Sequence, residues 1–196
     1  MWTPLHCAAA ANASESAERL LARGANVKAK ALYGTTPLHL AATCASDETT
    51  ALLLERGAEA NATDEFGRTP LHLAASFNRV NAIAALVDRG AAVSAKDVRG
   101  VTPLHLAVRA GQQASVDLLL ARGADSTLRT RSGATVLHEA AVSGSPELAS
   151  MLMRTCSRDA VARDARGKTP ADLAADRNNR NVASALRGVP ASAGIR

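Results

Sequence analysis

Histidine is the side chain in this sequence best suited to acid–base or metal chemistry near neutral pH. The five histidines lie 33 residues apart, and each follows a threonine by three positions. They are His6, His39, His72, His105 and His138. Because all five share one register of a recurring motif, we expect one shared role, hydrogen bonding a turn to a helix start and to the neighbouring repeat. None is left over as a general base, so we predict no catalytic site and no metal site.

The other chemical signals are sparse. The three cysteines, Cys7, Cys44 and Cys156, are odd in number and have no short-range partners, which argues against a disulfide framework and a CxxC metal site. The sequence has no glycine-rich phosphate loop and no HExxH. A reducing compartment fits this cysteine usage best, and we expect no cofactor.

The threonine–histidine motif belongs to a longer repeat. Thr-Pro-Leu-His occurs four times and is followed by Thr-Val-Leu-His and Thr-Pro-Ala-Asp, with successive starts 33 or 34 residues apart. The six starts are Thr3, Thr36, Thr69, Thr102, Thr135 and Thr169. A unit of this length cannot bury its apolar face alone, so we expect six copies to stack into one continuous core. Aromatic residues are only 2% of the chain, so alanine and leucine must fill that core.

One unit shows how the repeat is expected to fold locally. Residues 64–67 are turn formers that end in a glycine. Thr69 is then placed to cap a helix, and Pro70 takes its first position, where the missing amide hydrogen costs nothing. Asn78 ends this helix in a left-handed conformation. A second helix, with apolar residues at helical spacing, runs to about Val87.

The pattern Gly-x-Thr-Pro-Leu-His-x-Ala-Ala, a second leucine-rich helix and a closing Gly-Ala resembles the ankyrin repeat over residues 1 to about 188. The resemblance implies an all-α solenoid of helix-turn-helix units joined by short β-hairpin fingers. Its units start near residues 1, 34, 67, 100, 133 and 167, and residues 189–196 are expected to be a disordered tail. The family uses the finger tips and the exposed side of each first helix as a concave recognition face.

Several features depart from the family pattern. The first unit has no finger before its helix. Ala45 stands where Asn or Gly is expected, and Cys156 replaces the helix-ending glycine of the four preceding units. One residue is also inserted within 154–166, so we expect the fifth unit to be the least regular. The polar sequence at 176–181 indicates a terminal cap.

The four aromatic residues lie outside the repeated core positions. Tyr33 and Phe66 fall at finger tips, three residues before the motif threonine, Trp2 lies directly before that threonine, and Phe77 follows the motif histidine by five. These registers belong to the variable recognition set of the family. Aromatic residues and arginine are enriched at protein interfaces and their energetic hot spots, so we predict contact with a partner. The alternative is that they pack against a neighbouring finger and stiffen the array.

The charge is also unevenly distributed. Residues 1–98 carry a net charge of −1 and residues 99–196 a net charge of +6. Several of the excess cations fall near predicted finger tips: Arg99, Arg129, Arg131, Arg163, Arg166 and Lys168. A partner with an aromatic-seeking end and an acidic end would match this gradient, and the charge would mainly set association rate and orientation. The alternative is a solvated arginine-rich surface with no specific ligand.

The leading hypothesis is a non-catalytic protein-interaction scaffold or adaptor that binds another protein. Its predicted contacts are Tyr33, Phe66, Phe77, Arg99, Arg109, Arg131, Arg166 and Lys168. The second hypothesis is nucleic-acid or other polyanion binding, favoured by a pI of about 9.6 and expected to be steeply salt-dependent. Against it stands the absence of aromatic residues among the C-terminal arginines, which stacking on single strands would need.

A third hypothesis is that the chain is the substrate of a modifying enzyme. Leu53, Glu59 and Ala60 precede Asn61 by eight, two and one positions, which resembles the acceptor pattern of the asparaginyl hydroxylase that acts on ankyrin repeats. The equivalent positions in other units are Lys28, Ser94 and Thr127. The alternative is that Asn61 only makes turn hydrogen bonds.

The sequence shows no targeting or membrane signal. No apolar run approaches the roughly 18 residues of a membrane span, and no basic segment leads into an apolar signal core at the N-terminus. We expect a monomeric cytoplasmic protein, with the nucleus as the alternative compartment, or an excised piece of a larger one.

Overall fold

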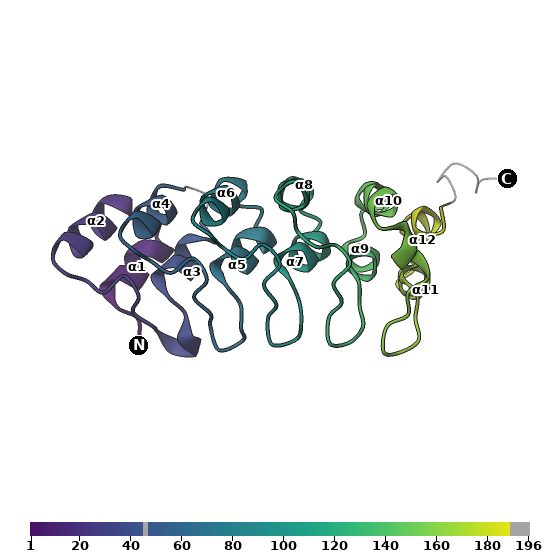
Figure 1. Cartoon of the computed structure of the whole chain (residues 1–196), viewed down its shortest axis with the longest axis horizontal. Helices are drawn as coiled ribbons and strands as arrows, with labels where there is room; N and C mark the ends of the chain where they lie inside the picture. Colours follow the sequence, from purple (N-terminus) through teal and green to yellow (C-terminus); the bar gives the residue numbers. More distant parts are fainter. Residues whose placement is uncertain (45–46, 189–196) are drawn as a thin grey trace.

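The computed structural model describes residues 1–44 and 47–188, which fold into α-helices arranged in six pairs along one row (Figure 1). We call the first helix of each pair inner and the second outer. The inner helices are α1 (Pro4–Ala10), α3 (Pro37–Ala41), α5 (Pro70–Ser76), α7 (Pro103–Arg109), α9 (Val136–Ser143) and α11 (Pro170–Asp176). The outer helices are α2 (Ser14–Ala22), α4 (Glu48–Glu55), α6 (Val80–Asp88), α8 (Gln113–Ala121), α10 (Pro146–Thr155) and α12 (Arg180–Leu186).

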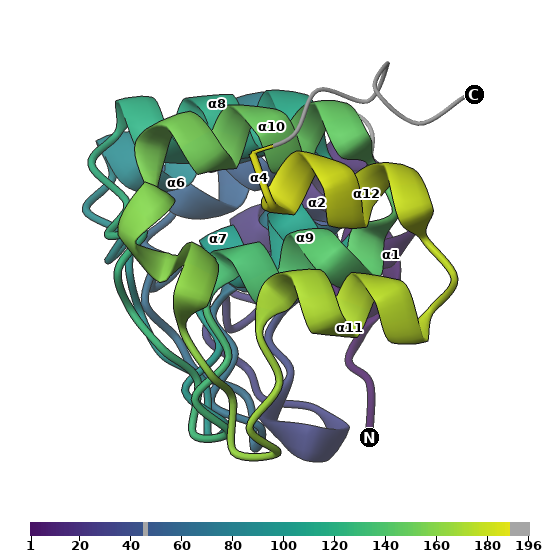
Figure 2. The same ribbon diagram turned by 90° about the vertical axis from the view of Figure 1, so that its right-hand side faces the viewer.

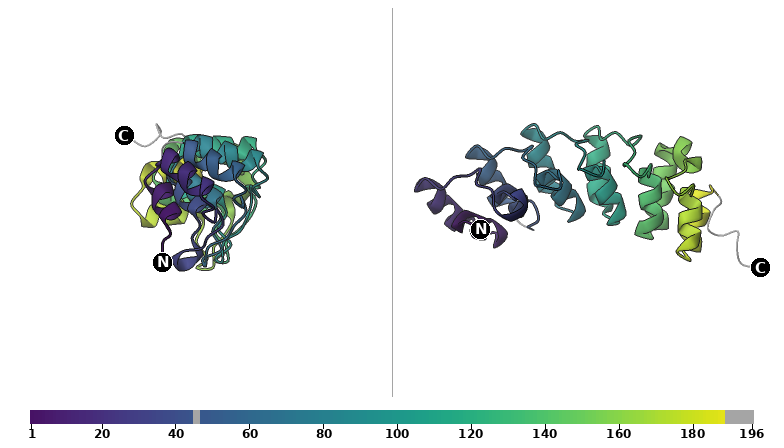
Figure 3. Two further views of the ribbon diagram at one scale, coloured as in Figure 1. Left: turned by 90° about the vertical axis from the view of Figure 1, so that its left-hand side faces the viewer. Right: turned by 90° about the horizontal axis from the view of Figure 1, so that it is seen from below.

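The helices form two layers, with the connecting loops extending beyond the inner layer. Figure 2 looks along the row and shows the outer helices above the inner ones, with five long loops below both. Each inner helix packs against its own outer helix and against the inner helix of the next unit. Seen from below, the units follow an arc (Figure 3). The predicted all-α solenoid is confirmed.

A continuous core of leucine and alanine joins the six units. One leucine, at the second position of the inner helix, is at most 1% exposed in each of the first five units: Leu5, Leu38, Leu71, Leu104 and Leu137. Burying such a side chain contributes about 1.5–3 kcal/mol of transfer free energy. Within the described residues, none of the buried core side chains is aromatic. The aromatic residues are therefore available for the surface.

The inner helices begin and end as the sequence predicts. Thr69 adopts an extended conformation as the N-cap of α5, and Pro70 occupies the first helical position. The left-handed conformation predicted at Asn78 is confirmed, with φ of 56°, and Gly111 and Gly144 adopt it at the same place in later units, with φ of 70° and 79°. Each of these residues turns the chain between an inner helix and its outer helix.

The fifth unit departs from the others at its outer helix. α10 ends at Thr155, and the next residue, Cys156, is buried and has a φ of −127° where other units place a left-handed glycine. The chain then enters a 3₁₀ helix, η2 (Ser157–Val161), which accommodates the inserted residue. Ala45 and the predicted tail at 189–196 lie outside the described residues.

The five loops are hairpin-like fingers, but their described residues form no β-strand. A second 3₁₀ helix, η1 (Leu32–Gly34), lies at the tip of the first finger. The finger before α5 is closed by two backbone hydrogen bonds, from Asp64 N to Arg68 O at 3.0 Å and from Gly67 N to Asp64 O at 2.9 Å. One further bond, from Glu65 N to Tyr33 O at 2.9 Å, joins it to the preceding finger. Single bonds hold the tips in line without building the ladder that defines a strand.

Candidate interaction surface

The motif histidines join three backbone segments at the start of the inner helices. In the third unit, His72 is fully buried, and its Nδ1 lies 2.9 Å from Thr69 Oγ1 and accepts the Thr69 amide at 3.0 Å. Its Nε2 therefore carries the proton and donates to Val101 O, at 3.0 Å, in the next unit. The matching acceptors for His6, His39 and His138 are the carbonyls of Thr35, Arg68 and Lys168. These rings are committed to joining one unit to the next.

The same arrangement recurs around the other motif threonines and histidines, with one weaker bond. Nδ1 lies 2.8 Å from the threonine hydroxyl in the pairs Thr36–His39 and Thr102–His105, and 3.0 Å in Thr135–His138. His105 Nε2 faces the Ala134 carbonyl without full hydrogen-bond geometry. Burial lowers the pKa of His39, His72 and His105, which favours the neutral ring that one donor and one acceptor require.

The fingers are shaped by a short polar side chain near their base. In the finger before α5, Asp64 Oδ1 accepts hydrogen bonds from Phe66 N at 2.9 Å and Arg68 N at 2.8 Å. Asp97 and Asp164 make the same pair of bonds in later fingers. Such Asx-type turns set the path of the backbone through the tip.

The first finger has no such side chain and adopts a different tip. Ala31 stands where the other fingers have aspartate or threonine, so no side chain accepts the tip amides there. Its tip closes into η1, and Tyr33 is left-handed, with φ 60° and ψ 24°. For a residue other than glycine this conformation costs on the order of 1 kcal/mol. Among described finger residues other than glycine, Tyr33 alone has a positive φ.

Tyr33 and Phe66 meet at neighbouring finger tips. Their ring centroids lie 5.9 Å apart with planes tilted by 39°, and the Arg68 guanidinium lies 5.0 Å from the centre of the Phe66 ring. Tyr33 remains 53% exposed and Phe66 46% exposed. We call these two residues the aromatic pair. Both readings of the sequence therefore apply, because each ring packs against the neighbouring finger and also faces solvent.

The other aromatic residues lie apart from this pair. Phe77 directly follows α5 and is 51% exposed. Trp2 is 50% exposed and stacks on His6, with ring centroids 6.5 Å apart. Leu32 and Val98 are also exposed and lie at finger tips beside the aromatic pair. The first three fingers thus present an apolar row.

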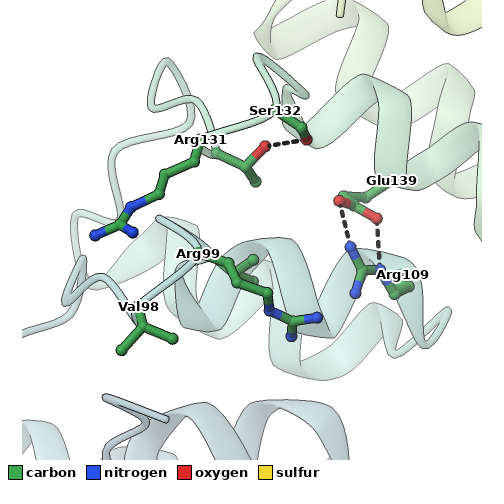
Figure 4. A pocket seen from close by; sticks show the side chains of 8 residues that line it. Val98, Arg99, Arg109, Arg131, Ser132 and Glu139 are labelled. Atoms are coloured by element: carbon green, nitrogen blue, oxygen red, sulfur yellow. Dashed lines mark hydrogen bonds and ion pairs between the residues drawn. The ribbon is translucent and has the colours of Figure 1, made fainter. Parts of the chain in front are cut away.

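Four of the predicted arginines line two neighbouring hollows between the later fingers and the inner helices. The first hollow, of about 320 Å³, has Arg99, Arg109, Arg131 and Glu139 as its charged lining residues (Figure 4). The second, of about 230 Å³, has Arg109, Glu139, Asp164, Arg166 and Arg177. Because both share Arg109, Ser132 and Glu139, we treat them as one site, the arginine hollow. Lys168 lines neither hollow, and its Nζ lies 3.4 Å from Asp176.

An ion pair divides the arginine hollow. Arg109 Nε and Nη2 donate to the two carboxylate oxygens of Glu139 at 2.6 and 2.7 Å (Figure 4). The Glu139 side chain is only 4% exposed, whereas that of Arg109 is 40% exposed. The hydrogen bonds that Arg109 donates to Glu139 raise the pKa of Arg109. They use two of the five N–H groups of the guanidinium and leave three for another ligand.

The charged residues of this site that were not among the predicted contacts are Asp164, Arg177 and, at its centre, Glu139. Glu139 occupies a register that is leucine at four other units: Leu40, Leu73, Leu106 and Leu173. Arg109 lies in the unit before Glu139 and also departs from the repeat. The residues at its position in other units include Thr43, Ser76 and Val142. The sequence signal for this pair is a charged residue, Glu139, at a position that is otherwise leucine. It lies 30 residues after Arg109, an arginine that is also unusual at its own position.

Asn61 is held between two units. Its Nδ2 donates to Gly90 O at 2.8 Å, and its Oδ1 accepts from Ala92 N at 2.8 Å. Both ends of the side-chain amide are thus used in joining one loop to the next. Hydroxylation of Asn61 stays a prediction.

The arrangement of stacked helix pairs, aligned fingers and off-template exposed residues defines a repeat solenoid with a one-sided surface. The family model described as "Ankyrin repeats (3 copies)" matches residues 1–64 and 48–130, and the chain belongs to this family. Members are generally protein–protein interaction modules and typically non-catalytic. No curated protein matches the chain. Within the described residues, no helix is long and apolar enough to cross a membrane.

Proposed function

We propose that this chain is a non-catalytic scaffold or adaptor that binds a partner protein through the face formed by the finger tips and inner helices. The proposed contacts are Tyr33, Phe66, Phe77, Arg99, Arg109, Arg131, Arg166 and Lys168. The aromatic pair carries the proposal. Two large rings lie half exposed on adjacent fingers, although the core of this chain is built from leucine and alanine. When a partner covers such rings, their removal from water lowers the free energy of the complex.

The backbone of the first finger supports the same assignment. Tyr33 holds a left-handed conformation that costs free energy, and its ring leans on Phe66 from there. Each ring limits the motion of the other, so a partner meets a surface that is already ordered. Preorganised aromatic anchors lose little side-chain entropy on binding, which is why such residues dominate interface energetics.

The test compares partner capture by the immobilised full chain with capture by the Tyr33→Ala/Phe66→Ala double variant. We expect the captured proteins, quantified by mass spectrometry, to fall at least about tenfold, because two hot-spot residues are removed. Val161→Ala is the matched control, since Val161 is 78% exposed in η2, away from the fingers. The melting temperature is measured for all three. An unchanged partner set in a folded double variant would refute the site.

The arginine hollow favours polyanion binding as a second candidate. Five arginines around two hollows would attract nucleic acid. The buried carboxylate of Glu139 and the lack of an aromatic residue in either lining argue against stacking single strands there. Electrophoretic shifts of duplex and single-stranded DNA at two salt concentrations separate the candidates, because only nucleic-acid binding predicts a tight complex that weakens steeply with salt.

A further inference from the structure

The charges of the arginine hollow do not balance. Its lining holds five arginines and two carboxylates, those of Glu139 and Asp164. Glu139 is used by Arg109, and Asp164 lies 3.3 Å from Arg166. Arg99 has only a distant partner, with 3.7 Å between its Nη2 and Asp97 Oδ2. Within the described part of the chain, neither Arg131 nor Arg177 lies within 4.0 Å of a carboxylate.

Some arginines outside the hollow have a carboxylate partner from another unit. Arg56 and Arg122, which directly follow outer helices, pair with carboxylates of the preceding unit, Glu18 at 3.1 Å and Asp88 at 2.9 Å. No such carboxylate stands beside Arg131 in the described residues. Positive charge therefore accumulates where the surface is hollowed.

The pair formed by Arg109 and Glu139 gives the site a fixed centre. Two hydrogen bonds hold the plane of the Arg109 guanidinium, and its remaining N–H groups lie where the two hollows meet. Figure 4 shows the Arg99 guanidinium directed to the same side as Arg109, with Arg131 extending away along the finger. An arginine held in this way recognises a planar carboxylate with little loss of side-chain entropy.

The size of the hollows and their buried carboxylates indicate the class of ligand. Volumes of about 320 and 230 Å³ suit side chains rather than a nucleic-acid strand. Glu139 and Asp164 would repel the dense charge of a phosphate backbone more strongly than separated single carboxylates. An extended peptide places alternate side chains on one face, so it presents carboxylates singly.

We infer that the arginine hollow is the recognition site for an acidic segment of the partner protein, with glutamate or aspartate side chains entering the two hollows. Arg109 contacts a carboxylate at the centre of the site, Arg99, Arg131 and Arg177 contact the others, and Glu139 is the positioning residue that orients Arg109. The inference rests on the proposed function and names the chemistry of one part of its surface.

The experiment measures fluorescence anisotropy of a labelled, end-capped hexaglutamate peptide with the full chain. Hexaglutamine and a single-stranded oligonucleotide of equal charge are the comparison probes. We expect Arg131→Ala/Arg177→Ala to weaken hexaglutamate binding about tenfold, the loss typical of removing charge-assisted hydrogen bonds. The matched control, Arg154→Ala/Arg158→Ala, removes the same charge from exposed residues outside the hollow and changes the affinity by less than about twofold.

Three results would overturn the inference: no binding of hexaglutamate, equal losses in the two double variants, or tighter binding of the oligonucleotide than of hexaglutamate. If the hollow variant does not fold, Ser132→Asp replaces it, because Ser132 lines both hollows and an added carboxylate there must also weaken binding. Hexaglutamate has no aromatic group, so Tyr33→Ala/Phe66→Ala leaves its binding unchanged. A failed hexaglutamate result with successful partner capture would therefore reject this site and leave the interaction module standing.

Discussion

The aromatic pair and the arginine hollow occupy the same face of one scaffold but are supported in different ways. Tyr33 and Phe66 are held by each other and by the finger backbone, and the buried Asp64 that supports Phe66 has counterparts in two later fingers, Asp97 and Asp164. Arg109 is instead held by Glu139, a carboxylate set into a position that other units fill with leucine. The comparison teaches that an apolar contact is built by changing the surface alone, whereas an oriented cation requires a change in the buried layer too.

The largest effect that would sharpen this comparison comes from removing one member of the ion pair. Arg109→Ser leaves the 4% exposed Glu139 side chain without its partner. We expect the free energy of unfolding to fall by about 3 kcal/mol, because an uncompensated charge stays buried. Glu139→Leu restores the residue of other units and costs less than about 1 kcal/mol, since the half-exposed Arg109 can turn to water.

Urea denaturation of the two single variants and of Arg109→Ser/Glu139→Leu measures this asymmetry. The double variant should recover most of the loss, because no buried charge remains. Equal costs for the two single variants would contradict the account, since they would show that burial of Glu139 is not what decides the energetics.

A second prediction separates the units by their response to acid. The pKa values of His39, His72 and His105 are lowered by burial from 6.5 in the folded state, so the unfolded chain binds more protons below that pH. Their contribution to stability is complete above pH 6.5 and is lost as the pH falls toward the folded-state pKa values. The loss is at most about 1.4 kcal/mol per pH unit for each histidine.

The sixth unit has Asp172 in place of the histidine and provides the internal control. Hydrogen bonds from Thr169 lower the pKa of Asp172 from 3.8, so its contribution persists at all pH values above 3.8 and is lost only below. Hydrogen exchange at pH 7 and pH 5, corrected for intrinsic rates, should show a loss of protection in α5 that exceeds the loss in α11. Larger losses in α11 would show that the histidines do not set the acid response.

The smallest expected effect tests why the aromatic end has an irregular tip. Ala31→Asp supplies the acceptor that the other fingers have, so the first finger should form the same Asx-type turn and release Tyr33 from its left-handed conformation. We expect the free energy of unfolding to rise by about 1 kcal/mol. Thermal melting measures this gain, and a crystal structure of the variant reports the φ of Tyr33. A destabilised variant with Tyr33 still left-handed would show that another contact sets the tip.

Most of the fold could be predicted from the sequence because the same helix start and end signals recur in each repeat. Threonine, proline and histidine at fixed spacing specify a capped helix start, and Asn78 or glycine specifies its end. Each of these signals acts within a few residues, so no knowledge of distant contacts is needed. The fingers implied by the family resemblance are present, and their described residues are joined by single backbone hydrogen bonds rather than strands, because strand pairing depends on neighbouring segments and not only on the local turn.

The site could be predicted only in part. The exposed aromatic residues were visible as deviations from the template, and packing against a neighbouring finger was the alternative that the sequence left open for them. Glu139 was not visible as a surface feature, because its role depends on a contact 30 residues away and on its burial. The conformation of Tyr33 depends on the absence of a hydrogen-bond acceptor at Ala31, where other fingers have aspartate or threonine. The absence of a side chain is difficult to recognise in a sequence as a structural signal.

The hydrogen bonds from four of the motif histidines to the next unit have a consequence for how such a chain diversifies. The acceptor is a main-chain carbonyl, and the residues that provide it are as different as Thr35, Arg68, Val101 and Lys168. The hydrogen bond between units therefore does not depend on which side chain the acceptor residue carries. Whole units are interchangeable in principle. Recombination can therefore reorder the outward-facing residues and keep the hydrogen bonds between units unchanged.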